Sequence, residues 1–292
     1  MRMFSANYNL LQVQLRQHSW RGLTYQLSYA WSAMLKADML RMNMSDPISI
    51  EVCVDSVASA IAADRGGGTR VELCGNLLEG GITPSAGMIE LVRQQISIGL
   101  QVMIRPRGGD FCYTADEFEI MRRDILVANK LGADGIVAGI LDAKGNVDIE
   151  RTRQLVDLAR PLNVTFHRAI DMSVDLILAA EDVCQTGANR LLTSGGEQTA
   201  RQGVEIISRV VRAARGRISV IACGGINRDN AASIVERTGV REIHVGLGTA
   251  VGSPMLHCNP RVSMGSVPGR EYQRRQVVEE DVINLRSALA QF

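Results

Sequence analysis

Gly132-Ala-Asp-Gly-Ile136 decides the fold, because its pattern returns three more times along the chain. A glycine, a small residue or valine, two variable residues and an aliphatic residue recur at Gly67-Gly-Thr-Arg-Val71, Gly187-Ala-Asn-Arg-Leu191 and Gly239-Val-Arg-Glu-Ile243. Glycine commonly ends a helix because it adopts the left-handed backbone conformation without steric cost. Each copy therefore indicates a helix end followed by a strand start, and the intervals of 52 to 65 residues each fit two strand–helix units.

Working outward from these glycines, short β-like runs alternate with helical patterns, as expected for a parallel sheet built from βαβ units. Two helix starts are marked, by the cap residue and proline of Thr83-Pro84 and by a capping box from Thr114 to Glu117. The eight expected strands cover residues 48–55, 69–76, 100–106, 135–141, 163–170, 190–195, 218–226 and 242–248. The chain is thus predicted to be α/β, a single-domain (β/α)8 TIM barrel over residues 46–292.

Composition excludes several classes of function. The net charge of +1 over 292 residues lacks the basic footprint of a nucleic-acid or anionic-membrane binder, so neither partner is expected. No apolar run reaches the roughly 18 residues that a membrane-spanning helix requires. Cysteines are scattered without a CxxC pair, which favours free thiols in a reducing compartment. They are Cys53, Cys74, Cys112, Cys184, Cys223 and Cys258.

Residues 1–45 differ from the rest and are interpreted as an N-terminal extension. They are rich in Met, Gln, Ser and Leu and contain no acidic residue before Asp38. An acid-poor, arginine-bearing leader is one form of mitochondrial transit peptide. We favour the alternatives, a disordered or loosely docked extension, or translated sequence ahead of a start at Met44.

Polar side chains alternate with aliphatic ones in several expected strands, although strands of a parallel barrel are usually apolar on both faces. The aliphatic faces should contact the helices, so the polar faces should point into the barrel or its upper rim. Charges placed there need partners, and Glu51, Glu72, Arg105 and Arg107 are predicted to compensate one another. The other inward polar residues are Cys53, Asp55, Arg70, Cys74, Asn76, Thr165, His167, Glu242 and His244.

Two of these inward residues, Cys53 and Cys74, are thiols at the same register of neighbouring strands. Parallel neighbours lie about 4.8 Å apart, so both sulfurs could reach one metal ion. Thiolates favour Cu(I) or zinc over hard cations. The alternative is that both are buried core residues, as free cysteines often are.

Other features suggest an anion site. Glycine-rich turns at Thr193-Ser-Gly-Gly196, Cys223-Gly-Gly-Ile226 and Gly246-Leu-Gly248 are similar to backbone cradles for phosphate, although tight turns need glycine in any case. Arg105 and Arg107 could clamp an anion from their loop. His167 and His244 are candidate acid or base groups or ligands, with satisfied core histidines as the alternative.

The same segments carry a family resemblance. Glu51-Val-Cys-Val-Asp-Ser56, Val71-Glu-Leu-Cys74, Glu79-Gly-Gly-Ile-Thr-Pro84, Arg105-Pro-Arg-Gly-Gly-Asp-Phe111, Thr165-Phe-His-Arg168 with Asp171, and Leu192-Thr-Ser-Gly195 together resemble the CutC family, named for copper homeostasis. The resemblance runs from about Ile48 to the end. It implies a cytoplasmic (β/α)8 barrel, often a homodimer, with Cu(I) bound by cysteines that match Cys53 and Cys74.

Two functional hypotheses follow, with a non-catalytic scaffold as a third. The first is a cytosolic copper-homeostasis protein that binds Cu(I) through Cys53 and Cys74. The second is an isomerase or lyase that acts on a small anionic or phosphorylated metabolite, with Glu51, Glu72 and His167 as acid and base groups. Its anion-binding residues would be Arg105, Arg107, Ser194, Gly195, Gly224 and Gly225.

Overall fold

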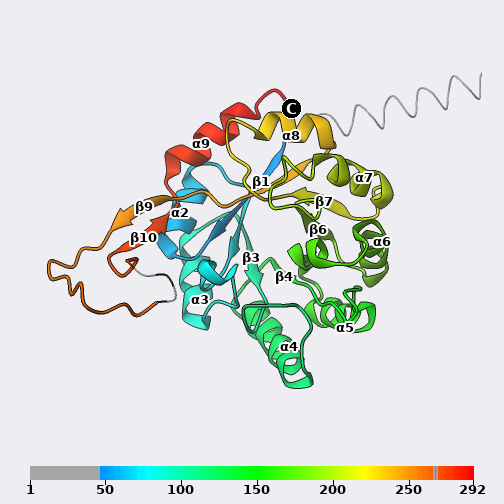
Figure 1. Ribbon diagram of the computed structural model, residues 1–292, viewed down its shortest axis with the longest axis horizontal. Coiled ribbons are helices and arrows are strands. Elements are labelled where there is room, and N and C mark those ends of the chain that lie inside the picture. The colour runs from blue at the N-terminus through cyan, green and yellow to red at the C-terminus, as the bar shows by residue number, and fades with distance from the viewer. Residues whose placement is uncertain (1–46, 266, 268) are drawn as a thin grey trace, which may run out of the picture. The chain divides into compact units, whose positions relative to one another are not determined.

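The computed structural model describes residues 47–265, 267 and 269–292, so the predicted extension over residues 1–45 lies outside the described residues. Eight parallel strands close into a barrel, each hydrogen-bonded to the next and β8 to β1 (Figure 1). The predicted (β/α)8 architecture is therefore confirmed. The strands are β1 Ser49–Val54, β2 Arg70–Leu73, β3 Gly99–Met103, β4 Gly135–Ala138, β5 Asn163–Phe166, β6 Arg190–Thr193, β7 Ser219–Ala222 and β8 Glu242–Val245.

Helices surround this barrel, as Figure 1 shows. They are α2 Val57–Arg65, α3 Ala86–Gln95, α4 Ala115–Lys130, α5 Ile149–Ala159, α6 Leu176–Thr186, α7 Val204–Ala214, α8 Ala231–Thr238 and α9 Glu279–Ala288. Two short 3₁₀ helices, η1 Leu77–Glu79 and η2 Arg168–Met172, follow β2 and β5. In the described part of the chain, none of the helices combines the length and apolar character needed to cross a bilayer.

The repeated glycines lie where the sequence predicts. Gly187 and Gly239 are the C-caps of α6 and α8, with φ of 85° and 77°, in the left-handed region that favours glycine. Gly67 and Gly132 have the same backbone conformation and lie just before β2 and β4, respectively. The internal repeat therefore marks the turn that returns each of these helices to the barrel.

Of the two predicted helix starts, one is confirmed and one is wrong. Thr114 caps α4, and Glu117 completes the capping box. The helix predicted from Thr83-Pro84 instead begins at Ala86 with Ser85 as N-cap. The reason is that the Thr83 hydroxyl accepts a hydrogen bond from the Arg105 N–H and donates one to its carbonyl, which ties this segment to the end of β3.

A short antiparallel hairpin, which the sequence did not predict, follows β8. Its strands are β9 Thr249–Gly252 and β10 Gln273–Gln276, and it projects from the left side of the barrel in Figure 1. The returning chain is anchored where the Val277 N–H donates to the Ser59 hydroxyl of α2. The hairpin therefore begins and ends at the barrel mouth.

Candidate functional site

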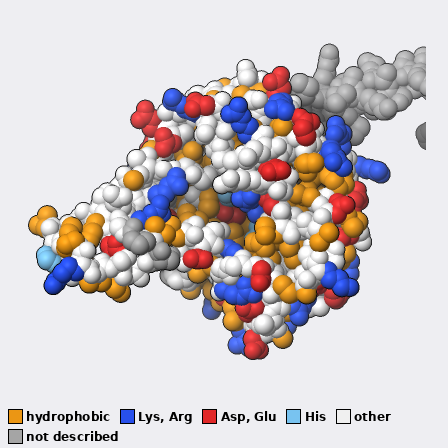
Figure 2. Space-filling view, in the orientation of Figure 1, with side chains coloured by type: hydrophobic (Ala, Val, Ile, Leu, Met, Phe, Trp, Pro, Cys, Tyr) orange, Lys and Arg blue, Asp and Glu red, His pale blue; other side chains and the backbone are white. Residues whose placement is uncertain are grey.

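A cavity of about 630 Å³ opens at the carboxyl ends of the strands. In this fold such a position usually holds the functional site, because the strand-to-helix loops converge there. Residues from β1, β2, β3, β6 and β8 line it together with the β9–β10 hairpin. Figure 2 shows the hollow near the middle of this face, with acidic and basic side chains in and around it.

Two thiols and a carboxyl group lie together at one side of the cavity. The sulfurs of Cys53 and Cys74 and an oxygen of Glu72 are all within 4.8 Å of one another. Cys53 and Glu72 line the cavity, whereas Cys74 lies beneath them against Met103 and Val137. Cys53 and Glu72 point inward, as strand alternation predicts. The prediction that Cys53 and Cys74 share a register is wrong, because Cys53 pairs with Glu72 and Cys74 lies two residues further along.

The two thiols have opposite pKa shifts. A hydrogen bond from Cys74 lowers the pKa of Cys53 to about 5, against the effect of burial and with help from the nearby imidazole of His244. The same hydrogen bond and burial raise the pKa of Cys74. At neutral pH the pair therefore holds one proton, with the thiolate on the cavity-lining Cys53. A thiolate is the form that binds soft metals and attacks electrophiles.

A network of buried charges supports this pair from below. Glu51 accepts from Arg70 Nε at 2.5 Å, and its other oxygen lies 2.8 Å from His244 Nδ1. Arg70 also pairs with Glu242 at 2.6 Å. Burial opposes ionisation of Glu51, but the hydrogen bonds from His244 and Arg70 outweigh it and lower its pKa to about 2. Glu51 is therefore an ionised carboxylate that fixes the imidazole of His244.

This network differs from the predicted one, in which Arg105 and Arg107 compensate Glu51 and Glu72. That prediction is wrong, because Arg70 is the register partner of Glu51 on the neighbouring strand. Arg105 lies beyond the end of β3 and donates instead to the carbonyls of its own and the adjacent loop. The sequence shows the charges on each strand but not the register between strands.

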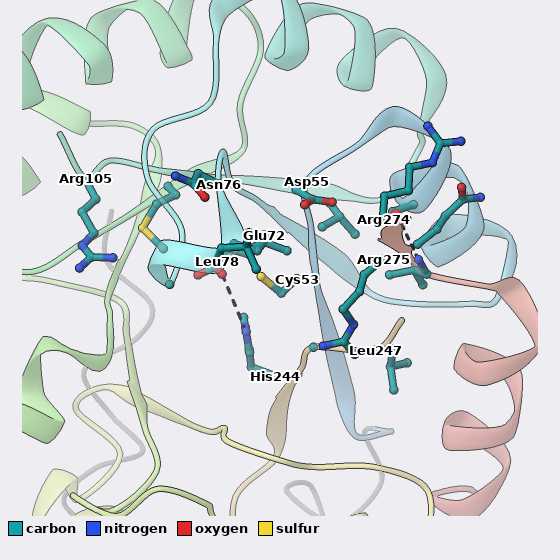
Figure 3. A pocket seen from close by; sticks show the side chains of 18 of the residues that line it. Cys53, Asp55, Glu72, Asn76, Leu78, Arg105, His244, Leu247, Arg274 and Arg275 are labelled. Atoms are coloured by element: carbon teal, nitrogen blue, oxygen red, sulfur yellow. Dashed lines mark hydrogen bonds and ion pairs between the residues drawn. The ribbon is translucent and has the colours of Figure 1, made fainter. Parts of the chain in front are cut away.

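Glu72 occupies a different environment from Glu51. Its Oε2 lies 3.8 Å from His244 Nε2, the contact drawn in Figure 3, while its Oε1 has no hydrogen-bond partner among the described residues. Burial raises the pKa of Glu72 well above its usual value, and the nearby Cys53 and Glu51 raise it further. Burial therefore favours the protonated, neutral form of Glu72 beside the thiolate, although the charge of His244 opposes it.

The structure separates the two arginines of the predicted anion clamp. Arg105 is 5% exposed and lines the cavity. Arg107 is not among the cavity-lining residues; it pairs with Asp110 at 3.0 Å and Glu117 at 2.6 Å. Figure 3 shows Arg105 on one side of the Cys53–Glu72–His244 group, with Arg274 and Arg275 on the other.

His167 directly follows β5 and lines the cavity. Its Nδ1 accepts a hydrogen bond from the Ala169 N–H at 3.2 Å, which caps η2. Burial lowers the pKa of His167 to about 3, and the positive charge of Arg105 lowers it further. The ring is therefore neutral, and because Nδ1 is the acceptor, the proton lies on Nε2.

The predicted phosphate cradle after β6 is filled from within the chain. The Asp171 carboxylate accepts from the backbone N–H groups of Ser194 and Gly196, and from the Thr193 and Ser194 hydroxyls. The Gly195 N–H donates to Thr193. An anion could take these donors only by displacing Asp171. Gly224 and Gly225, both at positive φ, lie beside this turn and are not among the cavity-lining residues.

Sequence reasoning missed the arginines of the hairpin region. Arg270, Arg274 and Arg275 line the cavity although they follow the last barrel strand. Their signal in the sequence was three arginines within residues 270–275, in a segment with no predicted element. Only the return of the hairpin to the mouth brings them to the site.

Fold and site together define a (β/α)8 barrel protein with a thiol pair, buried carboxyl groups and arginines gathered at its mouth. Comparison with known proteins agrees with the resemblance seen in the sequence. The family model described as CutC family matches residues 48–249. The chain belongs to the CutC family.

Relatives share most of their length with this chain. A CutC family protein of Chromobacterium violaceum is 44% identical over 240 residues, covering 82% of this chain and 97% of that protein. The mouse protein named copper homeostasis protein cutC homolog is 41% identical over 270 residues, covering 92% and 97%. The human protein of the same name is 46% identical over 217 residues, covering 74% and 80%.

Solved structures agree with the fold. The crystal structure of CutC from Streptococcus agalactiae has a TM-score of 0.64 and 34% identity, covering 68% of this chain and 97% of that one. Thiamine phosphate pyrophosphorylase from Pyrococcus furiosus has a TM-score of 0.51 at 20% identity, over 84% and 96% of the two chains. The second likeness shows the barrel fold alone.

Proposed function

We propose that this protein binds Cu(I) as cargo, through the sulfurs of Cys53 and Cys74, and serves in copper homeostasis in the cytoplasm. One observation carries the proposal: two thiols from adjacent strands lie within 4.8 Å of each other at the barrel mouth. Soft thiolate ligands favour Cu(I) over hard cations such as Mg²⁺ or Ca²⁺. The low pKa of Cys53, about 5, supplies one thiolate before any metal arrives.

The surroundings of the thiols support a metal-binding role. A ligating histidine usually donates its second ring nitrogen to a carboxylate, which fixes the ring. Glu51 holds His244 Nδ1 in this way, so His244 Nε2 faces the thiol side, 3.8 Å from Glu72. His244 Nε2 is thus available as a third metal ligand once it loses its proton.

The physiological role rests on the family. The mouse and human relatives are named for copper homeostasis, and all six cysteines of this chain are free thiols, as a reducing compartment requires. The homodimer implied by the resemblance remains a prediction. Light scattering on the purified protein tests it.

The enzyme hypothesis remains a second prediction, with altered roles for its residues. Both oxygens of Glu51 already accept hydrogen bonds, from Arg70 and His244, so Glu51 positions His244 rather than transferring protons itself. Glu72, with one oxygen unpartnered, and the neutral His167 remain the acid–base candidates.

Anaerobic titration with Cu(I), in competition with a chromophoric Cu(I) chelator, tests the copper proposal. The wild-type protein should bind about one Cu(I) per chain, and Cys53→Ser/Cys74→Ser should lose at least about a hundredfold in affinity, because both thiolates are gone. Cys223→Ala is the matched control, since Cys223 is a thiol as buried as Cys74 and contacts Leu192 and Ile221.

Thermal melting of each variant separates loss of the site from loss of the fold. The control should bind Cu(I) like the wild type. Retention of Cu(I) by a folded Cys53→Ser/Cys74→Ser variant contradicts the proposal, as does equal loss in Cys223→Ala.

A further inference from the structure

Arg105 is a buried cation without a carboxylate partner. Its guanidinium donates to the carbonyl oxygens of Glu79 at 2.8 Å, Gly81 at 3.0 Å and Gly109 at 2.7 Å. Among the described residues Arg105 has no ion pair within 4.0 Å, whereas Arg70, Arg107 and Arg168 each pair with a carboxylate. These carbonyl oxygens accept from two of the three guanidinium nitrogens, while Nε has no partner among the described residues. They do not cancel the charge, and a buried charge is costly unless paired. A bound anion would therefore neutralise the buried charge of Arg105.

His167, at the same place, has a hydrogen-bond donor without an acceptor. His167 is 3% exposed, its Nδ1 accepts from the Ala169 N–H, and its Nε2 has no partner within the described part of the chain. Gly139 makes room for the ring, because a Cβ there would lie 2.4 Å from His167 Nδ1. The imidazole is thus held rigidly, with an unused N–H donor on Nε2.

Both groups lie against one aromatic ring. The Arg105 guanidinium carbon is 4.9 Å from the centre of the Phe111 ring, and the His167 ring is 5.0 Å from it. All three side chains line the same cavity. A ligand placed on Phe111 can therefore meet the charge of Arg105 and the Nε2–H of His167 together.

The cavity as a whole favours a negatively charged ligand. Five arginines line it, against the two carboxyl groups of Asp55 and Glu72. The arginines are Arg105, Arg168, Arg270, Arg274 and Arg275. Apolar side chains, among them Leu77, Leu192 and Leu247, complete the lining. Such a lining suits an organic body carrying an anionic end.

The chemistry of the anion follows from the turn after β6. Phosphate sites in barrels of this type use backbone N–H groups of glycine-rich turns. Here the Asp171 carboxylate already accepts from the N–H groups of Ser194 and Gly196. The donors left at the Phe111 side are one imidazole N–H and one guanidinium, which suit the two oxygens of a carboxylate.

We propose that His167 and Arg105 form a binding subsite for the carboxylate of a small organic acid, whose body packs on Phe111. The subsite goes beyond copper binding and does not depend on it, because neither residue is a proposed copper ligand. Its ligand could be a substrate or a regulator that enters the same cavity as the metal.

NMR of the full, copper-free, reduced protein labelled with ¹⁵N-histidine tests the subsite directly. The chain has only four histidines, so the His167 Nε2–H signal can be assigned with one variant. Phenylacetate, 2-oxoglutarate and inorganic phosphate are the probes. At least one carboxylate should shift this signal downfield in a saturable way, while phosphate should not.

Variants identify the donors. His167→Asn keeps an acceptor for the Ala169 N–H but removes the Nε2–H, and it should weaken binding of the responding carboxylate at least about tenfold, the effect of one hydrogen bond to a charged group. His167→Gln restores a donor near Nε2 and should bind more tightly than His167→Asn. Arg105→Met should weaken binding at least as much, whereas Arg107→Met, outside the cavity, should not.

Several results would overturn the proposal. They are no response to either carboxylate, a larger response to phosphate, or equal affinity in a folded His167→Asn variant. If Arg105→Met does not fold, Arg105→Lys keeps the charge and should retain binding better than His167→Asn does. The Cys53→Ser/Cys74→Ser variant should bind the carboxylate normally, so failure of copper binding and failure of this subsite remain distinguishable.

Discussion

Two arcs of the barrel mouth occupy equivalent positions and differ in how their polar groups are satisfied. The thiol arc consists of Cys53, Glu72, Cys74 and His244, from β1, β2 and β8. The glycine-rich arc consists of Asp171, Ser194, Gly195 and Gly196, from the loops after β5 and β6. Each arc contains one carboxyl group shielded from solvent, with 4% of the Glu72 side chain and 6% of the Asp171 side chain exposed.

The two carboxyl groups have opposite surroundings. Asp171 accepts hydrogen bonds from the Thr193 and Ser194 hydroxyls and from two backbone N–H groups, and it pairs with Arg168 at 2.8 Å. Glu72 has one oxygen with no partner in the described structure, and burial raises its pKa. A position at a strand end is therefore not enough to mark a binding site. A polar group without a hydrogen-bond partner, such as Glu72, indicates a binding site, whereas a fully hydrogen-bonded group, such as Asp171, stabilises the loops.

The largest expected effect comes from removing the charge of Asp171. Asp171→Asn should cost about 2 to 4 kcal/mol of unfolding free energy, because it replaces Oδ2, which accepts from the Ser194 hydroxyl, with an amide donor and removes the charge that pairs with Arg168. Chemical denaturation at pH 7 measures the loss. A change within about 0.5 kcal/mol would show that the glycine-rich arc is not held by this carboxylate.

Asp175→Asn is the matched control for that variant. Asp175 caps α6 by accepting from the Ile177 and Leu178 N–H groups, and asparagine caps helices about as well as aspartate. The control should therefore change stability by only a few tenths of a kcal/mol.

The next effect concerns the thiol arc. Because Cys53 has a pKa of about 5, its alkylation by iodoacetamide should be nearly independent of pH above pH 6 and should slow as the pH falls through 5. Cys74→Ala removes the thiol hydrogen bond, raises the pKa of Cys53 and should slow its alkylation at pH 6 about tenfold. Mass spectrometry of the Cys53 peptide gives the rate.

The exposed Cys112 and Cys258 serve as internal standards in the same samples. Their rates should not change in Cys74→Ala. An unaltered Cys53 rate in that variant would mean that Cys74 does not stabilise the thiolate.

The smallest effect, of opposite sign to that of Asp171→Asn, is expected for Glu72→Gln. The folded pKa of Glu72 lies above its unfolded value, so its protonated form stabilises the fold below pH 4.5, and this contribution is lost as the pH rises toward the folded pKa. Glutamine has no such loss. Glu72→Gln should match the wild type within about 1 kcal/mol at pH 4.5 and become relatively more stable toward pH 8.

Denaturation curves of both proteins across this pH range measure the difference. A wild-type protein that gains stability over the variant as the pH rises would mean that Glu72 is an ionised, paired carboxylate like Asp171. The thiol arc and the glycine-rich arc would then not differ in how their carboxyl groups are satisfied.

Much of this protein follows from its sequence. The recurring glycine turns and the alternation of short strands with helices determine the barrel, because both reflect local backbone preferences and side-chain periodicity. Alternation also places Cys53, Glu72 and His167 at the barrel interior or rim, since successive strand residues point to opposite faces. Alternation puts both thiols on the inward face of β1 and of the chain after β2, but their offset of two residues is set by the register between the strands.

Tertiary structure alone decided which partner each polar group takes. Glu51 and His244 are 193 residues apart and meet only because the barrel closes. Asp171 fills the turn after β6, and the hairpin brings Arg274 to the mouth, through loop conformations that no periodic pattern encodes. Satisfaction of a hydrogen-bonding group depends on distances of a few tenths of an ångström between segments remote in sequence, and those distances are set only when the chain folds.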